Sequence, residues 1–190
     1  MNKTVMKAAL LAAFGVVAIA PLAASAANTS IGTVTINGAI VTSTCNVNSP
    51  TVTLPTVDTG TLASTGSTAG WTSFSVTLSG CSTVSGATKV FPYFSGSNVN
   101  TSNGYLNNNY TGTGSASNVE IALSNGQSTA AGTVLALQNA SGSQNVTAQA
   151  LPTTGTSTIN FNFYAGYVAA TAAATAGGVA TTVQYDLNYQ

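Results

Sequence analysis

Hydrophobic and polar residues alternate along much of the chain, most clearly at its C-terminus. Between residues 179 and 189 every odd position carries Val, Thr, Tyr or Leu, and the even positions are mostly polar. Side chains of a β-strand point to opposite faces in turn, so this pattern predicts a strand with one face to bury. A strand of this length needs a neighbour along both edges, because an unpaired edge favours aggregation.

The same alternation predicts strands elsewhere. It is strong at residues 74–81 and 159–163. Weaker or shorter strands are expected at 52–54, 88–94, 105, 119–123, 133–137 and around 146. The 88–94 segment contains Pro92, which makes it either an edge strand or a strand interrupted by a bulge. Residues 165–178 are rich in alanine, but their glycines and threonines and the lack of charged pairs favour a loop over a helix.

The first 26 residues have the three parts of a secretory signal. Two lysines precede an apolar run at residues 8–20, and the small residues 24–26 form a cleavage site, so we expect residues 1–26 to be removed. The alternative, an uncleaved membrane anchor, is disfavoured because Pro21 interrupts the run and the run is short for a full span.

About 164 residues would remain after cleavage, which is enough for one domain with a hydrophobic core. Seven to nine short strands, with no convincing helix after the signal, are typical of a sandwich. We therefore predict an all-β fold of two antiparallel sheets packed face to face.

The stretch after the signal, residues 27–40, also alternates. Its even positions share one face of an expected strand, and Thr33, Thr35 and Asn37 lie on the other. The shared face consists of Gly32, Val34, Ile36, Gly38 and Ile40. A strand at the end of the mature chain could enter the core of another molecule, or it could be the first strand of a complete sandwich.

Charge is almost absent. The 190 residues contain three Lys or Arg, three Asp or Glu and no His. After cleavage only Lys89 would face Asp58, Glu120 and Asp186, a formal charge of −2. One cation cannot supply a nucleic-acid surface or hold an anionic membrane. A surface so poor in charge also offers little repulsion between copies, which suits a protein that packs against itself.

The chain also lacks the residues that most catalytic and metal sites require. A nucleophilic triad needs a base and no histidine exists, and the three carboxylates are scattered over different segments. Zinc and copper sites need clusters of His, Cys or carboxylate. We therefore expect no enzyme, no cofactor and no metal.

Two cysteines, Cys45 and Cys81, follow the signal and are expected in an oxidising compartment. An even count there favours a disulfide, with two buried thiols as the alternative. A bridge closing about 37 residues would contribute roughly 3 to 4 kcal/mol in the chain-entropy model.

Four features together resemble the major subunits of chaperone–usher fimbriae of Gram-negative bacteria, of the type 1 kind. Gly-Thr-Val-Thr-Ile-Asn-Gly-Ala-Ile follows the signal and runs toward Cys45, and Phe-Ser-Val-Thr-Leu-Ser-Gly-Cys ends at Cys81. Ile-Asn-Phe-Asn-Phe-Tyr-Ala lies in the last third of the chain. Gly177 is fourteenth from the end and Tyr189 is next to last.

The resemblance implies an immunoglobulin-like sandwich that lacks its seventh strand, so that a hydrophobic groove stays open beside the last strand. Residues 27–40 would be an N-terminal donor strand and residues 41–190 the pilin domain, with the C-terminal strand 178–189 beside the groove. A periplasmic chaperone would lend a strand first. At the outer-membrane usher, the extension of the next subunit would replace it, and backbone pairing would supply affinity while side chains in pockets supply register.

The resemblance also implies roles for individual residues. Gly32, Val34 and Ile36 would be inserted, with Gly32 in a shallow pocket, and Gly38 and Ile40 share their face. Ser30 or Ile31 would make the initiating contact. The groove and the chaperone contact would involve Gly177, Val179, Thr181, Val183, Tyr185, Leu187 and Tyr189. Cys45 and Cys81 would form the disulfide.

The expected function is a structural subunit of a surface pilus that supports adhesion and biofilm formation. Its expected partners are other copies of itself, the chaperone, the usher, and tip or adaptor subunits. Two alternatives stay open: an adhesive or lectin-like subunit that binds a glycan through Trp71, Tyr105 or Tyr110, and a minor adaptor or terminating subunit.

Overall fold

The computed structural model describes residues 34–36, 45–81, 86–125, 133–153 and 157–190. Residues 34–36 fall in one compact unit, Met1–Gly38, and the other described residues fall in a second, Ala39–Gln190. The expected signal peptide and most of the expected donor strand therefore lie outside the described residues. In the part of the chain that is described, no helix has the length and apolarity needed to cross a bilayer.

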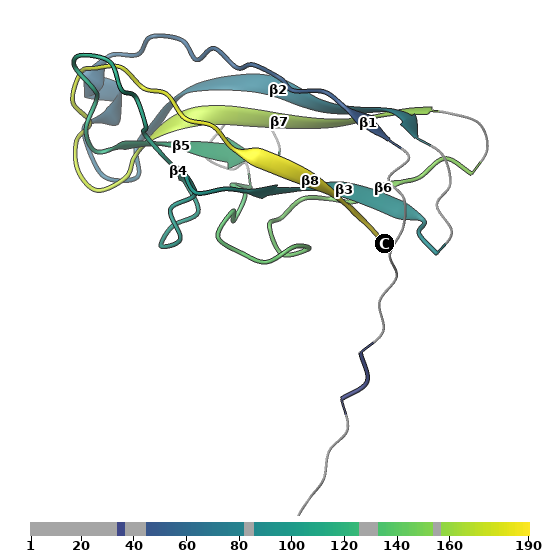
Figure 1. The fold of residues 1–190 in the computed structure, drawn as a ribbon. Coiled ribbons are helices and arrows are strands. Elements are labelled where there is room, and N and C mark those ends of the chain that lie inside the picture. Colours follow the sequence, from purple (N-terminus) through teal and green to yellow (C-terminus); the bar gives the residue numbers. More distant parts are fainter. Residues whose placement is uncertain (1–33, 37–44, 82–85, 126–132, 154–156) are drawn as a thin grey trace, which may run out of the picture. The chain divides into compact units, whose positions relative to one another are not determined.

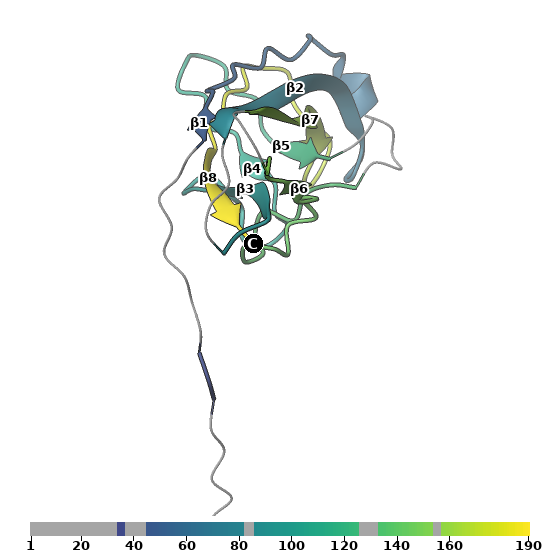
Figure 2. The ribbon, with the colours of Figure 1, turned by 90° about the vertical axis from the view of Figure 1, so that its right-hand side faces the viewer.

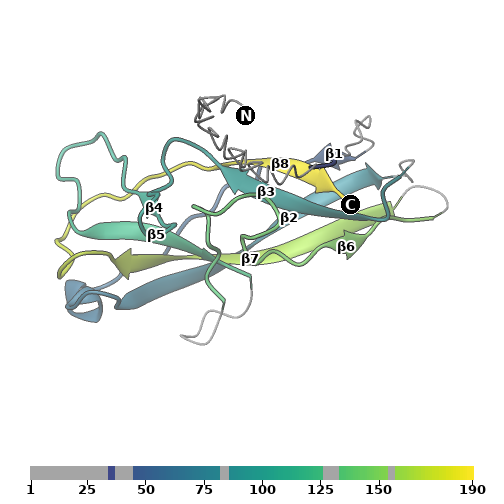
Figure 3. The same cartoon turned by 90° about the horizontal axis from the view of Figure 1, so that it is seen from below.

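The second unit consists of two antiparallel sheets (Figures 1 and 2). In strand order, the five-stranded sheet contains β1 (Asn46–Val47), β2 (Thr68–Cys81), β7 (Ser157–Ala169), β5 (Val119–Ser124) and β4 (Leu106–Asn107). The three-stranded sheet, which faces the viewer in Figure 3, contains β6 (Gln149–Ala150), β3 (Lys89–Ser95) and β8 (Gln184–Tyr189). A short 3-10 helix, Thr59–Leu62, precedes β2. The prediction of an all-β sandwich is confirmed.

The core lies between the two sheets and follows the predicted alternation. Val76 and Leu78 of β2 are fully buried, and Phe161 and Phe163 of β7 are buried beside them. The ring of Phe163 meets that of Phe94 from the opposite sheet edge to face, with centroids 5.2 Å apart. Burying side chains of this size stabilises a fold by roughly 1.5 to 3 kcal/mol each.

Strand β7 is longer than its sequence predicts. The expectation of a loop from residue 165 is wrong for residues 165–169, which continue the strand between β2 and β5. Ala165 pairs with Thr72 on one side and Leu123 on the other. A partner on each side overrides the weak strand propensity of alanine and glycine, because burial and cross-strand packing decide strand formation.

Pro92 lies inside β3 without a bulge. The register of β3 with β8 runs without a break from Val90 opposite Tyr189 to Ser95 opposite Gln184. The N–H and C=O of Phe94, two residues after Pro92, bond to the side chain of Gln144 on the opposite edge. Because neighbouring residues of a strand alternate between its edges, the nitrogen of Pro92 also faces away from β8, and no ladder bond is lost. β3 is the middle strand of its sheet, but β6 pairs only with Lys89 and Val90, so the edge that Pro92 turns away from β8 has no strand partner at that position among the described residues.

The predicted strand at 133–137 is wrong. Leu135 and Leu137 are buried, as the pattern requires, but this segment forms only an isolated bridge between Val134 and Ser124. The weak strand expected around residue 146 is displaced to Gln149–Ala150. Two apolar side chains can enter a core from a loop, so alternation over five residues does not require a ladder.

Candidate acceptor groove

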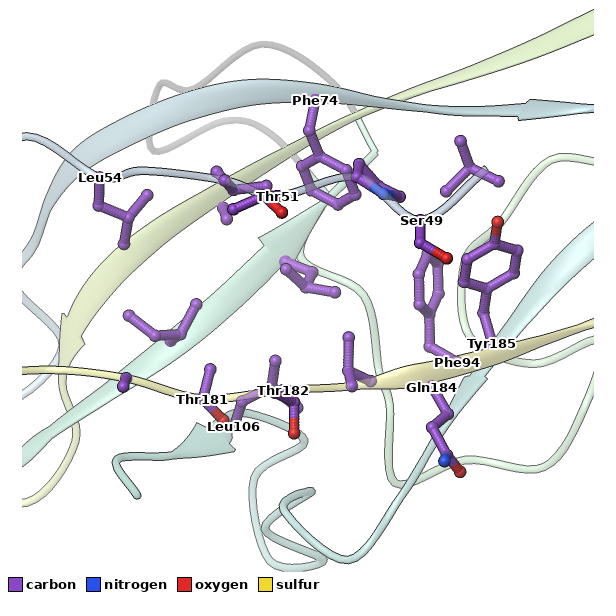
Figure 4. Close-up of a pocket in the computed structure, with 18 of the residues that line it drawn as sticks. Ser49, Thr51, Leu54, Phe74, Phe94, Leu106, Thr181, Thr182, Gln184 and Tyr185 are labelled. Atoms are coloured by element: carbon purple, nitrogen blue, oxygen red, sulfur yellow. The ribbon is translucent and has the colours of Figure 1, made fainter. Parts of the chain in front are cut away.

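An open groove of about 930 Å³ runs between two extended segments of the second unit (Figure 4). One wall is formed by residues 47–54 and the other by residues 179–186. Its floor is the sandwich core, with the side chains of Phe74, Val76, Phe94, Leu106, Ile121, Leu123, Ala165 and Tyr167. The groove is therefore apolar at its base and bordered by backbone along both sides.

The first wall starts at the disulfide and at β1. Cys45 and Cys81 are bridged, as predicted, and Asn46 and Val47 pair with Ser79 and Leu78 of β2. The side chain of Asn48 extends this attachment, since its amide donates to Ser75 O at 3.1 Å and its oxygen accepts from Thr77 N–H at 2.8 Å.

Beyond Asn48 the chain leaves β2. Residues 49–54 form no strand, although Val52 and Leu54 pack against the core. Sequence reasoning expected a short strand here and did not identify it as a groove wall. The alternation of Val52 and Leu54 was the available signal, but it does not reveal that the segment lies across the core from the C-terminus.

The second wall is the C-terminal segment, and here the prediction needs a correction. The expected strand 178–189 forms a ladder only over Gln184–Tyr189, where β8 pairs with β3. β3 ends at Ser95, so it offers no ladder partner to the residues before Gln184. The side-chain pattern nevertheless continues, because Val179, Thr181 and Val183 are half-buried beside the groove whereas Ala180 and Thr182 are exposed.

The structure distributes the predicted groove residues as follows. Val179, Thr181, Val183 and Tyr185 line the groove. Leu187 and Tyr189 are half-buried against the core outside the groove lining. Gly177 lines a separate cavity of about 220 Å³ that shares Val179 and Tyr167 with the groove. A side chain at position 177 would meet the backbone of Gly114 and Ala116 at 2.4 Å, so this close approach requires glycine.

Tyr185 connects the two walls. Its hydroxyl, on β8, donates a hydrogen bond to the backbone oxygen of Asn48, and its ring lies 5.9 Å from that of Phe94. Loss of water around the ring raises the pKa of Tyr185 above its usual value, and the same cause raises the pKa of Tyr167 on the floor. Both tyrosines are therefore neutral at physiological pH, when Tyr185 can donate to Asn48.

One polar atom in the groove lacks a partner. The hydroxyl oxygen of Thr181 is buried and has no hydrogen-bond partner among the described residues. An unmade bond of this kind costs about 1 to 3 kcal/mol. A backbone group entering the groove could satisfy it. Together, an apolar floor and two backbone walls suit an extended peptide whose side chains alternate between the floor and the solvent.

Only two of the predicted donor residues are described, Val34 and Ile36. Both side chains are exposed, at 84% and 88% of their surface. Ser30, Ile31, Gly32, Gly38 and Ile40 lie outside the described residues. Two large apolar side chains on one face of an extended segment, both open to water, fit a segment that is buried only in an assembly.

The aromatic residues considered for glycan binding lie on separate elements. Trp71 of β2 lies against Gly166 of β7, whereas Tyr110 lies against Gly112 and Gly178. Tyr105 directly precedes β4. Among the residues that the structure describes, no three His, Cys, Asp or Glu side chains are grouped so that they could hold a metal ion.

Comparison with known proteins gives consistent matches. Residues 54–190 match the family described as FimA, type-1 fimbrial protein A. The F17 fimbrial protein of Escherichia coli is 40% identical over 167 residues, which cover 84% of this chain and 87% of that protein. The major fimbrial subunit SMF-1 of Stenotrophomonas maltophilia (strain K279a) is 39% identical over 180 residues, 90% and 98% of the two chains.

A solved structure of a chaperone–usher pilus superposes with a TM-score of 0.50 at 17% identity, covering 85% of this chain and 97% of that one. A likeness at this identity concerns the fold. It identifies the two-sheet sandwich as immunoglobulin-like, as the resemblance implied.

Proposed function

The chain belongs to the type-1 fimbrial protein family and is a structural subunit of a pilus, and we propose that it polymerises by donating residues 27–40 to the groove of the next copy. The observation that carries this proposal is the groove itself, an apolar floor left open between the walls 47–54 and 179–186. Its apolar complement is the exposed pair Val34 and Ile36. In the alternating sequence pattern Gly32, Gly38 and Ile40 belong to the same face, and in this proposal they complete the donor.

The energetic balance supports a strand of this length. Moving an apolar side chain such as Ile36 from water to the core contributes about 1.5 to 3 kcal/mol. Each ladder hydrogen bond adds on the order of 1 kcal/mol, and ordering the tail costs roughly 1 to 2 kcal/mol per residue. The persistence of such a polymer then depends on the unfolding barrier of the acceptor, which is a kinetic property.

We further propose the route that the family implies. The chain is exported with cleavage after residue 26, and a periplasmic chaperone covers the groove. The usher then exchanges the chaperone's strand for the next subunit's extension, and tip or adaptor subunits complete the fibre. Its relatives are fimbrial proteins, so the final location is a fimbrium at the cell surface. Adhesion and biofilm formation follow from the fibre, and catalysis has no part in this proposal.

A charge placed on either face of the donor tests this function. Ile36→Asp would put a carboxylate into the apolar groove, where an unpaired charge is strongly disfavoured, so we expect at least a tenfold loss of oligomers that resist detergent without heating. Thr35→Asp is the matched control, because residue 35 lies on the opposite face of the strand and should leave the oligomer ladder unchanged. Equal assembly by both variants would contradict the proposal.

A further inference from the structure

Apart from an isolated bridge between Gly178 and Ser115, the segment 178–183 that precedes β8 has no strand partner in the described part of the chain. In Figure 1 it continues the line of β8 past the end of the neighbouring strand β3. Backbone groups this close to a core need hydrogen-bond partners. The structure supplies those partners from another part of the chain, residues 98–116.

Side chains of two asparagines provide part of these bonds, and backbone groups of the same loop provide the others. The amide of Asn98 donates to Thr182 O at 2.9 Å and approaches the Thr182 hydroxyl at 3.0 Å. Asn108 bonds at two points, since its oxygen accepts from Ala180 N–H at 3.0 Å and its amide donates to Gly178 O at 3.1 Å. Backbone groups complete the set. Asn109 N–H donates to Ala180 O at 2.7 Å, Ala116 N–H donates to Gly178 O at 3.0 Å, and Gly178 N–H donates to Gly114 O at 2.8 Å.

These bonds fall on the same edge as the ladder of β8. Gln190 and Lys89 exchange both backbone hydrogen bonds, at 2.9 Å each, so the even residues of β8 face β3. The residues held by the asparagines, 178, 180 and 182, are also even. One edge of the C-terminal segment is therefore hydrogen-bonded at 178, 180 and 182 by side-chain amides and loop backbone, and from 184 to 190 by β3.

The consequence concerns the opposite edge. Because backbone groups alternate between edges, the odd residues from 179 to 185 present their N–H and C=O on the edge beside the groove. The buried, unpartnered hydroxyl of Thr181 faces the same way. A side-chain amide can do this work because it carries a donor and an acceptor side by side, like a peptide group, and is uncharged.

We propose that Asn98 and Asn108 are positioning residues that replace a strand beside 178–183, so that an incoming strand can pair along the whole segment rather than along β8 alone. This inference rests on the proposed function, because it concerns the length of the edge that the donor meets. The polar segments before and after β4 would then contribute to donor binding by holding the acceptor edge in place, although they make no apolar contact with the donor.

Amide hydrogen exchange tests this at single residues. The full chain is mixed with an excess of a synthetic peptide of residues 27–40, and the peptide-dependent protection of each amide is measured. We expect the unsubstituted chain to gain at least 100-fold protection at the odd amides 179–187. In Asn108→Ala the gain at 179, 181 and 183 should fall at least tenfold, while the gain at 185 and 187 stays.

Asn160→Ala is the matched control, because Asn160 is exposed on the outward face of β7 and its side chain is remote from the C-terminal segment. Exchange in β2 and β7 without peptide reports whether each variant folds. If Asn108→Ala does not fold, Asn98→Ala is measured instead, and the loss should be confined to the amides at 181 and 183.

The outcomes separate the two proposals. Undiminished protection at 179–183 in the folded variants would overturn the positioning role while leaving donor binding intact. An equal loss at 185 and 187 in a folded variant would overturn it as well, because the asparagines contact only the upstream half. If the unsubstituted chain gains no protection at any odd amide, the proposed function itself fails.

Discussion

At the scale of the residue, Gly166 shows how closely the outward face of β7 is packed. A side-chain carbon added at this glycine would lie 2.4 Å from the ring of Trp71, which belongs to the neighbouring strand β2. Trp71 is adjacent to Gly70, whose φ of 66° lies in the left-handed region, at an irregularity in the pairing of the two strands. The indole ring of Trp71 therefore packs directly on Gly166, where a larger residue would collide with it.

Gly166→Ala should expel that ring. We expect a loss of about 1 to 3 kcal/mol in the free energy of unfolding, the usual range for overpacking, and a red shift of tryptophan emission as the ring enters water. Trp71 is the only tryptophan in the chain, so the emission reports this site alone. Urea denaturation followed by fluorescence measures both quantities.

The control is the same substitution in a Trp71→Ala background, where there is no ring to displace. The cost of alanine at position 166 should then largely disappear, because the two residues interact directly. An equal cost in both backgrounds would show that the glycine is needed for some other reason.

Single residues also mark the limit of prediction from sequence. Alternation placed Val76 and Phe163 in the core correctly, because a strand's inward face depends on local spacing. It gave no indication of Asn108, whose side chain reaches Gly178, 70 residues away. The chain is rich in asparagine, and its sequence does not distinguish an asparagine that holds another segment in place from one whose side chain is only hydrated.

At the scale of the element, sequence reasoning succeeded where strands pair with strands. Residues 74–81 and 119–123 fall within β2 and β5. It failed where a segment is held by side chains or by a loop, as at 133–137, or where neighbours on both sides extend a weak strand, as at the end of β7. The first groove wall, residues 47–54, is another segment without a strand ladder, since only its start is paired with β2.

That wall depends on the Cys45–Cys81 disulfide. The strand after Cys45 has two residues, too few to hold the segment by itself, and the disulfide joins it to the last residue of β2. A double Cys45→Ala and Cys81→Ala variant should lose about 3 to 4 kcal/mol in the free energy of unfolding, the chain-entropy value for a separation of 36 residues. Denaturant titration of both proteins under non-reducing conditions measures this.

Local amide exchange shows whether the disulfide holds the first groove wall in place or only stabilises the domain as a whole. Amide exchange at residues 46–48 should quicken in the double variant more than exchange in β7, because the wall detaches before the sandwich unfolds. A uniform change across the domain would show that the wall is held independently of the disulfide.

At the scale of the whole molecule, the scarcity of charge is the feature that sets its solution behaviour. In the described residues Lys89 is on β3, Asp186 on β8, and Asp58 caps the 3-10 helix. Glu120 is buried in β5, and its two oxygens accept from the amides of Asn100 and Asn103 at 2.8 and 2.7 Å. The remaining surface presents hydroxyls and amides, so apolar contact and backbone pairing are left to drive assembly.

Assembly should therefore be nearly independent of ionic strength. Between 0.01 and 0.3 M NaCl the screening length shrinks from about 30 Å to below about 10 Å, which slows association steered by charge many-fold. For this chain we expect less than a twofold change in the rate of oligomer formation, followed by light scattering. Sulfate should accelerate it, because excluded salts strengthen apolar burial.

A Lys89→Gln variant serves as the control, since it removes the lysine on β3 and should leave both salt responses unchanged. A rate that falls steeply with NaCl in the unsubstituted chain and not in this variant would identify Lys89 as a contact between subunits. The donor-strand mechanism predicts the opposite, because its contacts are apolar side chains and uncharged backbone, which NaCl at these concentrations leaves almost unaffected.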